Sequence, residues 1–290
     1  MKYQFIEQYK HKFAIVVMCQ VLGVSESGFY AWRKRPASQR KREDALLTQE
    51  IRQVFEKHRG RYGSPRIHRE LRDQGRGISR KRVARLMCEA ELAARRKHRR
   101  VLTTKRDATH PVAPHVLNRE FKAPEPNTKW VTDSTYIPTT QGWLYLAVIL
   151  DLYSRAVVGW SMSDCCDAQL AETALNMAVS RRRRHPQDCC ITVIAGVNTL
   201  VEQARKRLEQ MAAVGSQSRK GNCWDNAAME SFFGSLKEEC VGNTIYPSHE
   251  QARRALFEYL EIYSNRIRRH STLGYMSPLV SEQLGSQQTK

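Results

Sequence analysis

Apolar residues recur at helical spacing through the first third of the chain. Within 13–32 this pattern predicts two short helices around a turn, because Gly23 interrupts the first and Ser25 can cap the second. The arrangement is typical of a helix-turn-helix, although other helical pairs share it. Three longer helices are predicted downstream, at 45–57, at 65–74 and from residue 79.

From residue 129 the period changes to that of β-strands. Strands are predicted at 130–138, 143–152 and 156–162, and the short turns between them favour an antiparallel meander. Strands followed by helices indicate an α/β or α+β domain, and we predict an α/β fold preceded by an all-α helix-turn-helix region. The later helices are expected at 168–183, 201–213, 226–239 and 249–264.

Charge divides the chain into two unequal parts. Lys and Arg number 48 against 29 Asp and Glu, a net charge of +19, and almost all of the excess lies before residue 124. A basic half beside a balanced half suggests that the first half binds nucleic acid, although a merely soluble basic protein has the same composition. No apolar run approaches the ~18 residues that cross a bilayer, so we expect no membrane partner. Eight cysteines without a CxxC pair favour reduced thiols in a cytoplasmic protein.

Cations gather at the start of the helix that begins near residue 79. A helix whose first turns carry such side chains suits entry into a DNA groove, whereas the plain alternative is a solvated cationic face. A second basic run at 95–106 is followed by several prolines, which predicts a linker over 94–128 that can follow DNA phosphates. The candidate DNA contacts on the helix are Arg80, Lys81, Arg82 and Arg85.

Two carboxylates are notable for their positions. Asp133, in WVTDSTYI, lies in a predicted strand, where a buried charge is costly unless a ligand or hydrogen bonds compensate it. Glu230 lies one turn into a predicted helix and follows a basic loop. Asp151 is interpreted as structural, because Arg155 offers it a partner. The loop before Glu230 supplies candidate phosphate contacts in Arg219, Lys220 and Asn222.

Four stretches carry a more specific signal: WVTDSTYI, GWLYLAVILDLYSRAVVGW, SRKGNCWDNAAMESFFGSLKEE and RRHSTLGYMSP. In this order they resemble the second-frame transposases of small bacterial insertion sequences, a DDE group with a retroviral-integrase-like core. The similarity covers 129–280, and 44–92 resembles the helix-turn-helix segment of that family. It implies a ribonuclease-H-like fold, DNA partners (insertion-sequence ends and target DNA), and metal-dependent transfer of DNA 3′ ends into a target strand.

The resemblance also implies roles for the two acids, with Asp133 as the first and Glu230 as the third member of a catalytic, metal-binding triad. Such carboxylates hold two Mg²⁺ (or Mn²⁺) ions about 3.5–4 Å apart. Mg²⁺ prefers hard oxygen ligands, which excludes the cysteines. Paired DNA ends imply at least a homodimer on DNA, and an upstream-frame protein of the same element is a further candidate partner. The expected location is the cytoplasm, at the nucleoid.

The middle acid of the triad is missing. The family carries it in a stretch resembling HHSDRGSQYT, and the usual spacing before Glu230 falls on Ile194, which cannot bind a metal. A gene segment encoding GLLHHSDRGSQYT with permitted codons, read one base late, gives DCCITVIAGVNTL, which is this chain over 188–200. We hypothesise a compensated frameshift that removed the acid and strongly impaired strand transfer. The alternative is a genuine variant in which Asp188 substitutes as a ligand.

The favoured function is therefore an insertion-sequence transposase with a damaged active site. One alternative is a non-catalytic DNA-binding repressor, or an inhibitor of an intact relative. Another is a generic two-metal nuclease, which the same fold could support. The domains are predicted as a helix-turn-helix-like segment at 1–42, a helical DNA-binding domain at 43–93, a basic linker at 94–128 and an integrase-like core at 129–285.

Overall fold

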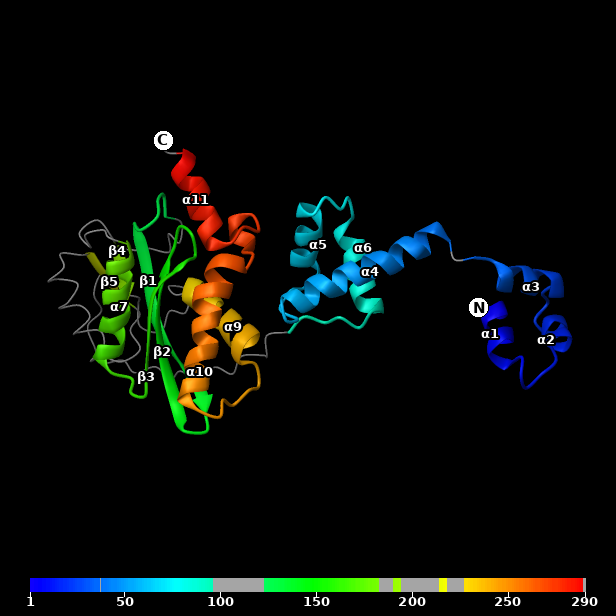
Figure 1. Ribbon diagram of the computed structural model, residues 1–290, viewed down its shortest axis with the longest axis horizontal. Helices are drawn as coiled ribbons and strands as arrows, with labels where there is room; N and C mark the ends of the chain where they lie inside the picture. The colour runs from blue at the N-terminus through cyan, green and yellow to red at the C-terminus, as the bar shows by residue number, and fades with distance from the viewer. Residues whose placement is uncertain (37, 96–122, 183–189, 194–213, 218–226, 289–290) are drawn as a thin grey trace.

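The computed structural model describes residues 1–36, 38–95, 123–182, 190–193, 214–217 and 227–288. Three short helices at the N-terminus pack around a small core of their own (Figure 1): α1 (Lys2–Tyr9), α2 (Ile15–Val21) and α3 (Glu26–Lys34). The hydroxyl of Ser25 accepts a hydrogen bond from the backbone N–H of Gly28 at 3.1 Å and caps α3, as predicted. Helix α1 was not expected. The core side chains are Ile6, Met18, Cys19 and Phe29.

A second helical group contains α4 (Gln39–Lys57), α5 (Ser64–Asp73) and α6 (Arg80–Glu89). Helix α4 begins at Gln39 rather than at residue 45, because Ser38 caps it by accepting a hydrogen bond from the backbone of Lys41 at 3.2 Å. The other two helices match their predicted positions closely. The apolar face of each turns inward, and the buried set includes Leu47, Ile51, Val54, Ile67, Leu71, Val83 and Leu86.

One five-stranded sheet, with the strand order β3-β2-β1-β4-β5, forms the C-terminal half. The strands β1 (Lys129–Thr139), β2 (Gly142–Asp151) and β3 (Val157–Ser163) form the predicted antiparallel meander. Beyond β1, the short strands β4 (Cys190–Val193) and β5 (Val214–Gln217) are added in parallel. The sheet is therefore mixed, which the sequence pattern did not predict.

Helices cover both faces of this sheet (Figure 1). On one face, α7 (Ala168–Arg182) packs against Trp130 and Ile149. On the other face lie α9 (Ala227–Leu236) and α10 (His249–Phe257), which share a core with the opposite side chains of β1 and β2. Because both faces are covered, β2 is apolar at nearly every position, which confirms the α/β class.

Both helices on the second face continue beyond their α-helical parts. Helix α9 runs into a π-helical turn at Lys237–Val241, and α10 runs into a π-helical segment at Glu258–Ile267. Such segments are rare and occur often at functional sites. A final helix, α11 (Pro278–Gln288), packs against the π-helical end of α10. The helix predicted at 201–213 lies outside the described residues.

Strand β3 and helix α7 approach each other closely at Gly159. A Cβ atom at this position would lie 2.2 Å from the backbone oxygen of Ala174 and 2.8 Å from Cβ of Ala178. We expect Gly159→Ala to lower the free energy of unfolding by about 1–3 kcal/mol through overpacking, measured by urea unfolding. Gly77→Ala is the control, because nothing lies within 4 Å of its added Cβ. Equal losses in the two variants would contradict the prediction.

In the described part of the chain, no single helix has the length and apolar character to cross a membrane. Helices α2 and α3, which are bent by 112° relative to each other, pass that test as a pair by length and composition only.

Candidate functional site

Asp133 lies near the middle of β1, on the face of the sheet that α9 covers. Side chains alternate along a strand, so Asp133 shares its face with Val131 and Ile137. Both of these belong to the core that includes the buried face of α9. Asp133 is half-buried, and its Oδ1 accepts a hydrogen bond from the backbone N–H of Ser134 at 2.8 Å. Its carboxylate therefore belongs to the layer between the sheet and α9.

Helix α9 places Glu230 beside the same layer. The helix forms because its apolar residues fall on one side, where Met229 and Phe233 are buried against the sheet. Glu230 is half-buried between these two positions in the first turn, where the helix dipole favours a negative charge. The strand acid and the helix acid thus come from the two elements that pack directly on each other.

Strand β4, which directly precedes the predicted position of the middle acid in the sequence, lies next to β1. Strand β4 runs parallel to β1 with Thr132 opposite Val193, and the next residue along the chain is Ile194. Ile194 and the alternative ligand Asp188 both lie outside the described residues. Within the described ranges, no group of three His, Cys, Asp or Glu side chains could hold a metal ion. The described part of the predicted metal site therefore supplies two carboxylates, those of Asp133 and Glu230.

Two of the candidate DNA contacts on α6 are engaged with α4 instead of pointing away from the protein. Asp44 accepts hydrogen bonds from Arg82 Nε and Arg85 Nη2, each at 2.7 Å, and these bonds hold the pKa of Asp44 below its ordinary value. Arg80 and Lys81 are exposed at the start of α6, and the described residues contain no ion pair with either. The loop residues Arg219, Lys220 and Asn222 lie outside the described residues.

Asp151 has the structural role that the sequence suggested, but through backbone groups. It is fully buried, and it accepts hydrogen bonds from the backbone N–H groups of Asn127 (2.6 Å) and Tyr153 (2.7 Å). The Trp130 indole also donates to it, at 3.3 Å. Burial raises the pKa of Asp151. The carboxylate therefore organises the turn between β2 and β3.

A buried ion pair in the core, which the sequence pattern did not predict, is also contacted by the helical group. Glu239 is 5% exposed, and its carboxylate accepts hydrogen bonds from Arg268 Nε and Nη2 at 2.8 Å and from Tyr259 at 3.0 Å. Arg66 of α5 reaches the same carboxylate at 3.3 Å. Burial alone would raise the pKa of Glu239, but Arg268 holds it below its ordinary value.

A second ion pair crosses the same boundary. Arg269 Nε lies 2.7 Å from Glu70 of α5, and the backbone N–H of Arg269 donates to the Tyr62 hydroxyl at 2.9 Å. Consecutive residues, Arg268 and Arg269, thus connect to two acids that lie far from each other in the sequence. Only the three-dimensional arrangement reveals these partners.

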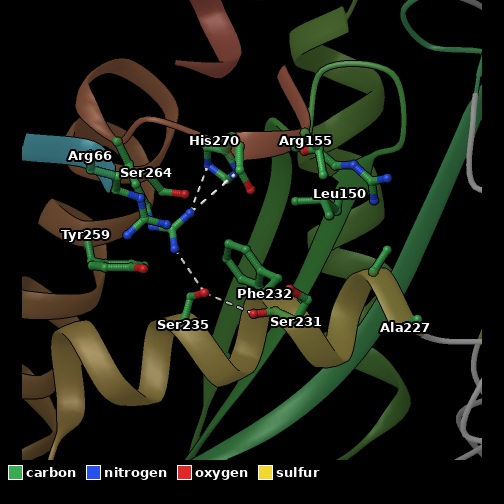
Figure 2. Close-up of a pocket in the computed structure, with 14 residues that line it drawn as sticks. Arg66, Leu150, Arg155, Ala227, Ser231, Phe232, Ser235, Tyr259, Ser264 and His270 are labelled. Atoms are coloured by element: carbon green, nitrogen blue, oxygen red, sulfur yellow. Dashed lines mark hydrogen bonds between the residues drawn. The ribbon is translucent and has the colours of Figure 1, made fainter. Parts of the chain in front are cut away.

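His270 follows the two arginines and lines the pocket shown in Figure 2. Its Nε2 lies 3.3 Å from Arg268 Nη1. Burial and the charges of Arg268, Arg66 and Arg155 lower the pKa of His270 to about 3. The unfolded chain takes up a proton near pH 6.5, so unfolding is favoured by acid between these two values.

We therefore expect the wild type to lose stability as the pH falls below 6.5, by up to about 1.4 kcal/mol per pH unit more than His270→Gln does. The stability that depends on neutral His270 is fully present above pH 6.5. Urea unfolding at pH 7.5 and pH 5.5, in a phosphate-free buffer, measures the difference between the two proteins. The same pH dependence in both would show that His270 is not the group responsible.

Family models match most of the described chain. An HTH-like domain matches residues 41–100, and two integrase core domain models match residues 123–192 and 215–278. The two core matches leave 193–214 uncovered, which is the part of the sequence that contains Ile194.

Curated relatives cover nearly the whole chain. Transposase InsF for insertion sequence IS3A from Escherichia coli (strain K12) is 41% identical over 280 residues, which are 96% of this chain and 97% of the relative. The insertion element IS600 uncharacterized 31 kDa protein from Shigella sonnei is 41% identical over 261 residues, 90% of this chain and 96% of the relative.

Solved integrase structures also align with the chain. One is the simian T-cell lymphotropic virus intasome in complex with a PP2A regulatory subunit, with 15% identity, a TM-score of 0.46, and coverage of 80% of this chain and 74% of that chain. Another is the catalytic core domain of BIV integrase, with 13% identity, a TM-score of 0.40, and coverage of 56% of this chain and 98% of that chain.

The mixed sheet with helices on both faces, together with the matched core models, defines an integrase-core protein of ribonuclease-H-like fold that carries an HTH-like region. More particularly, the chain belongs to the InsF family of insertion-sequence transposases, because it is 41% identical to those proteins over almost its entire length.

Proposed function

We propose that this protein is an insertion-sequence transposase by descent, in which the helical region binds the ends of the element and the core holds the DNA to be joined. Asp133 and Glu230 are the acids of the core. The supporting observation is their placement on β1 and α9, two elements that pack on each other, in a chain of the InsF family.

Magnesium (or manganese) is the cofactor that such acids would hold. Asp133 and Glu230 offer the hard oxygen ligands that these ions prefer, and a bound ion supplies positive charge to a reacting phosphate. Two carboxylates do not complete a two-ion site, and Ile194 is apolar where the family has its middle acid. The described donor set therefore does not fit the intact cofactor arrangement.

We infer that strand transfer is strongly impaired. The cause proposed is a compensated frameshift over 188–200, and the core-model matches leave most of this stretch uncovered. Purified protein incubated with fluorescent insertion-sequence ends, target plasmid and Mg²⁺ is expected to bind the ends without joining them. Joining at a rate equal to that of an intact InsF relative, assayed in parallel, would overturn this inference. The nucleotide sequence of the gene tests the cause separately, because an alternative frame there must encode an HSD-type stretch.

A second function has its own support, because DNA binding does not need the missing acid. The basic helical region matches the HTH-like model over 41–100. A chain that occupies the ends without joining them acts as an inhibitor of an intact relative. Coexpression of the two proteins is expected to lower the transposition frequency of a marked element. An unchanged frequency, with normal end binding by this chain, would rule out this second function.

The exposed cations at the start of α6 are the proposed groove contacts. We expect the double variant Arg80→Ala/Lys81→Ala to weaken DNA binding and to reduce the slope of log affinity against log salt by about two, one for each phosphate that is no longer neutralised. Its thermal unfolding midpoint is expected to stay that of the wild type. Arg82→Ala is the matched comparison, because Arg82 binds Asp44 and its removal should lower the unfolding midpoint. If the salt slope of the double variant equals that of the wild type, Arg80 and Lys81 do not contact DNA phosphates.

The assembly follows from the same proposal. Two ends must be held together before they are joined, so the DNA-bound form is at least a homodimer, and an upstream-frame protein of the element is a candidate partner. Acting on DNA, the protein belongs at the nucleoid. In the proposed domain organisation, 1–42 and 43–93 recognise DNA, 94–128 is a linker and 129–285 is the core.

A further inference from the structure

A cavity of about 310 Å³ lies where the helical region meets the core (Figure 2). Three arginines from separate elements line it: Arg66 of α5, Arg155 of the turn between β2 and β3, and Arg268 at the end of the π-helical segment. Helix α9 forms one wall. The pocket therefore brings together side chains from both parts of the protein, none of which contributes a carboxylate to the metal-binding layer.

Hydroxyl groups line the cavity between the arginines. Ser231 and Ser235 lie one turn apart on α9, and Figure 2 shows them along the wall that this helix provides. Ser235 accepts a hydrogen bond from Arg268 Nη2 at 3.0 Å. Ser264 faces the cavity from the π-helical segment. The lining hydroxyls also include those of Tyr259, Ser271 and Thr272.

The lining carries net positive charge. It contains three arginines and His270, and neither Asp nor Glu is among the described residues that line it. From outside the cavity, Glu239 pairs with Arg268 and also accepts a hydrogen bond from Arg66 at 3.3 Å, so it compensates part of this charge. Burial and the charges of the three arginines together lower the pKa of His270.

One buried hydroxyl lacks a partner. Ser264 is 1% exposed, and its Oγ makes no hydrogen bond within the described part of the chain. Leaving a buried hydroxyl unsatisfied is unfavourable, so a ligand in the cavity that accepts its hydrogen bond would remove this penalty. Arg155 reaches the cavity from the turn between β2 and β3, where its backbone has a φ of +61°.

We propose that this pocket binds a phosphate group, with Arg155 and Arg66 as the charged donors and Ser264 as a buried hydroxyl donor. A phosphate presents several acceptor oxygens to donors that converge from different sides, and arginine matches its geometry through paired N–H groups. A DNA backbone is the expected source, because Ser231 directly follows Glu230 on α9 and the pocket thus adjoins the acidic layer. The assignment to DNA rests on the proposed function, whereas the phosphate site itself does not.

Titration calorimetry with inorganic phosphate, at constant ionic strength, tests the site. We expect Arg155→Gly to weaken phosphate binding about tenfold, since a charge-assisted hydrogen bond is removed, and glycine tolerates the positive φ. We expect Ser264→Ala to weaken binding about fivefold while leaving the unfolding midpoint in phosphate-free buffer unchanged or higher, because an unsatisfied hydroxyl is removed. Arg254→Ala is the charge control, since Arg254 is 78% exposed and pairs with Glu250 on the surface of α10. Equal phosphate affinity in the wild type and both pocket variants would overturn the proposal.

A competition experiment distinguishes the two sources of phosphate. If the site holds a DNA backbone, a duplex oligonucleotide displaces phosphate, and Arg155→Gly and Ser264→Ala bind the duplex more weakly than Arg254→Ala does. If the site takes a free phosphate or nucleotide, the duplex leaves phosphate binding unchanged, and ATP competes instead. The second result would overturn the assignment to DNA while supporting the phosphate site. Neither outcome depends on strand transfer, so a negative result for the phosphate site can be distinguished from a negative result for the proposed transposase function.

Discussion

Joining of DNA ends is expected to appear when residues 188–200 are replaced by GLLHHSDRGSQYT. This replacement returns a carboxylate to position 194, next along the chain from the last β4 residue that pairs with β1. A metal site in its complete form contributes several kcal/mol of transition-state stabilisation, so we expect a rate increase of at least about 100-fold. The measurement is a strand-transfer assay with labelled insertion-sequence ends, supercoiled target DNA and Mg²⁺.

The controls isolate the carboxylate from the rest of the replaced segment. The same replacement carrying Asn at position 194 keeps the length and polarity of the segment but removes the charge, and it should stay inactive. Asp133→Asn in the restored protein should abolish the recovered joining, while binding to the ends persists. If the fully restored protein binds the ends and is no more active than the parent, the missing middle acid is not what limits this chain.

Removing the buried carboxylate at the junction is the second large effect that we expect. Glu239→Ala leaves Arg268, which is 6% exposed, without its charged partner. Breaking a buried pair from one side typically costs about 3–5 kcal/mol, because the remaining charge is desolvated and uncompensated. Guanidinium unfolding followed by circular dichroism should therefore show a large fall in the midpoint of the core transition.

Two further variants show whether charge or packing is responsible. Glu250→Ala removes a carboxylate that is 71% exposed and pairs with Arg254 on the surface of α10, where such pairs contribute little. The double variant Glu239→Leu/Arg268→Met removes both buried charges and fills their space, so it should recover most of the missing stability. If it is as unstable as Glu239→Ala, the destabilisation comes from packing and from the bonds to Arg66 and Tyr259.

Local periodicity was enough to locate the meander and most of the helices. The strand-like composition of β1, β2 and β3, the short turns between them and the cap at Ser25 depend on neighbouring residues, and the structure confirms these predictions. A strand over 191–197 entered only with the alternative interpretation in which Asp188 is a ligand, and β5 was not predicted, because β4 and β5 are each four residues long and pair in parallel with partners distant in the sequence. No local pattern of that length separates such a strand from other apolar segments.

For the candidate site, the sequence predicted some features correctly and missed others. Asp133 and Glu230 were selected from motifs, and their elements were placed correctly as a strand and a helix. The cations of α6 were treated as equivalent, whereas Asp44 engages Arg82 and Arg85. That distinction depends on how α4 packs on α6. The spacing of residues along a single helix carries no information about this packing.

The sequence alone determined the family and the α/β class, because both follow from residue type and order, and on the same basis it predicts the two acids and the absence of the middle one. The tertiary structure decided which charges meet. It placed Glu239, Arg268 and Arg66 in one buried cluster, and it left Ser264 facing a cavity lined with arginine. These partners come from elements far apart in the chain, and the energy of a buried charge or hydroxyl depends on the groups around it in space and not on its neighbours in the sequence.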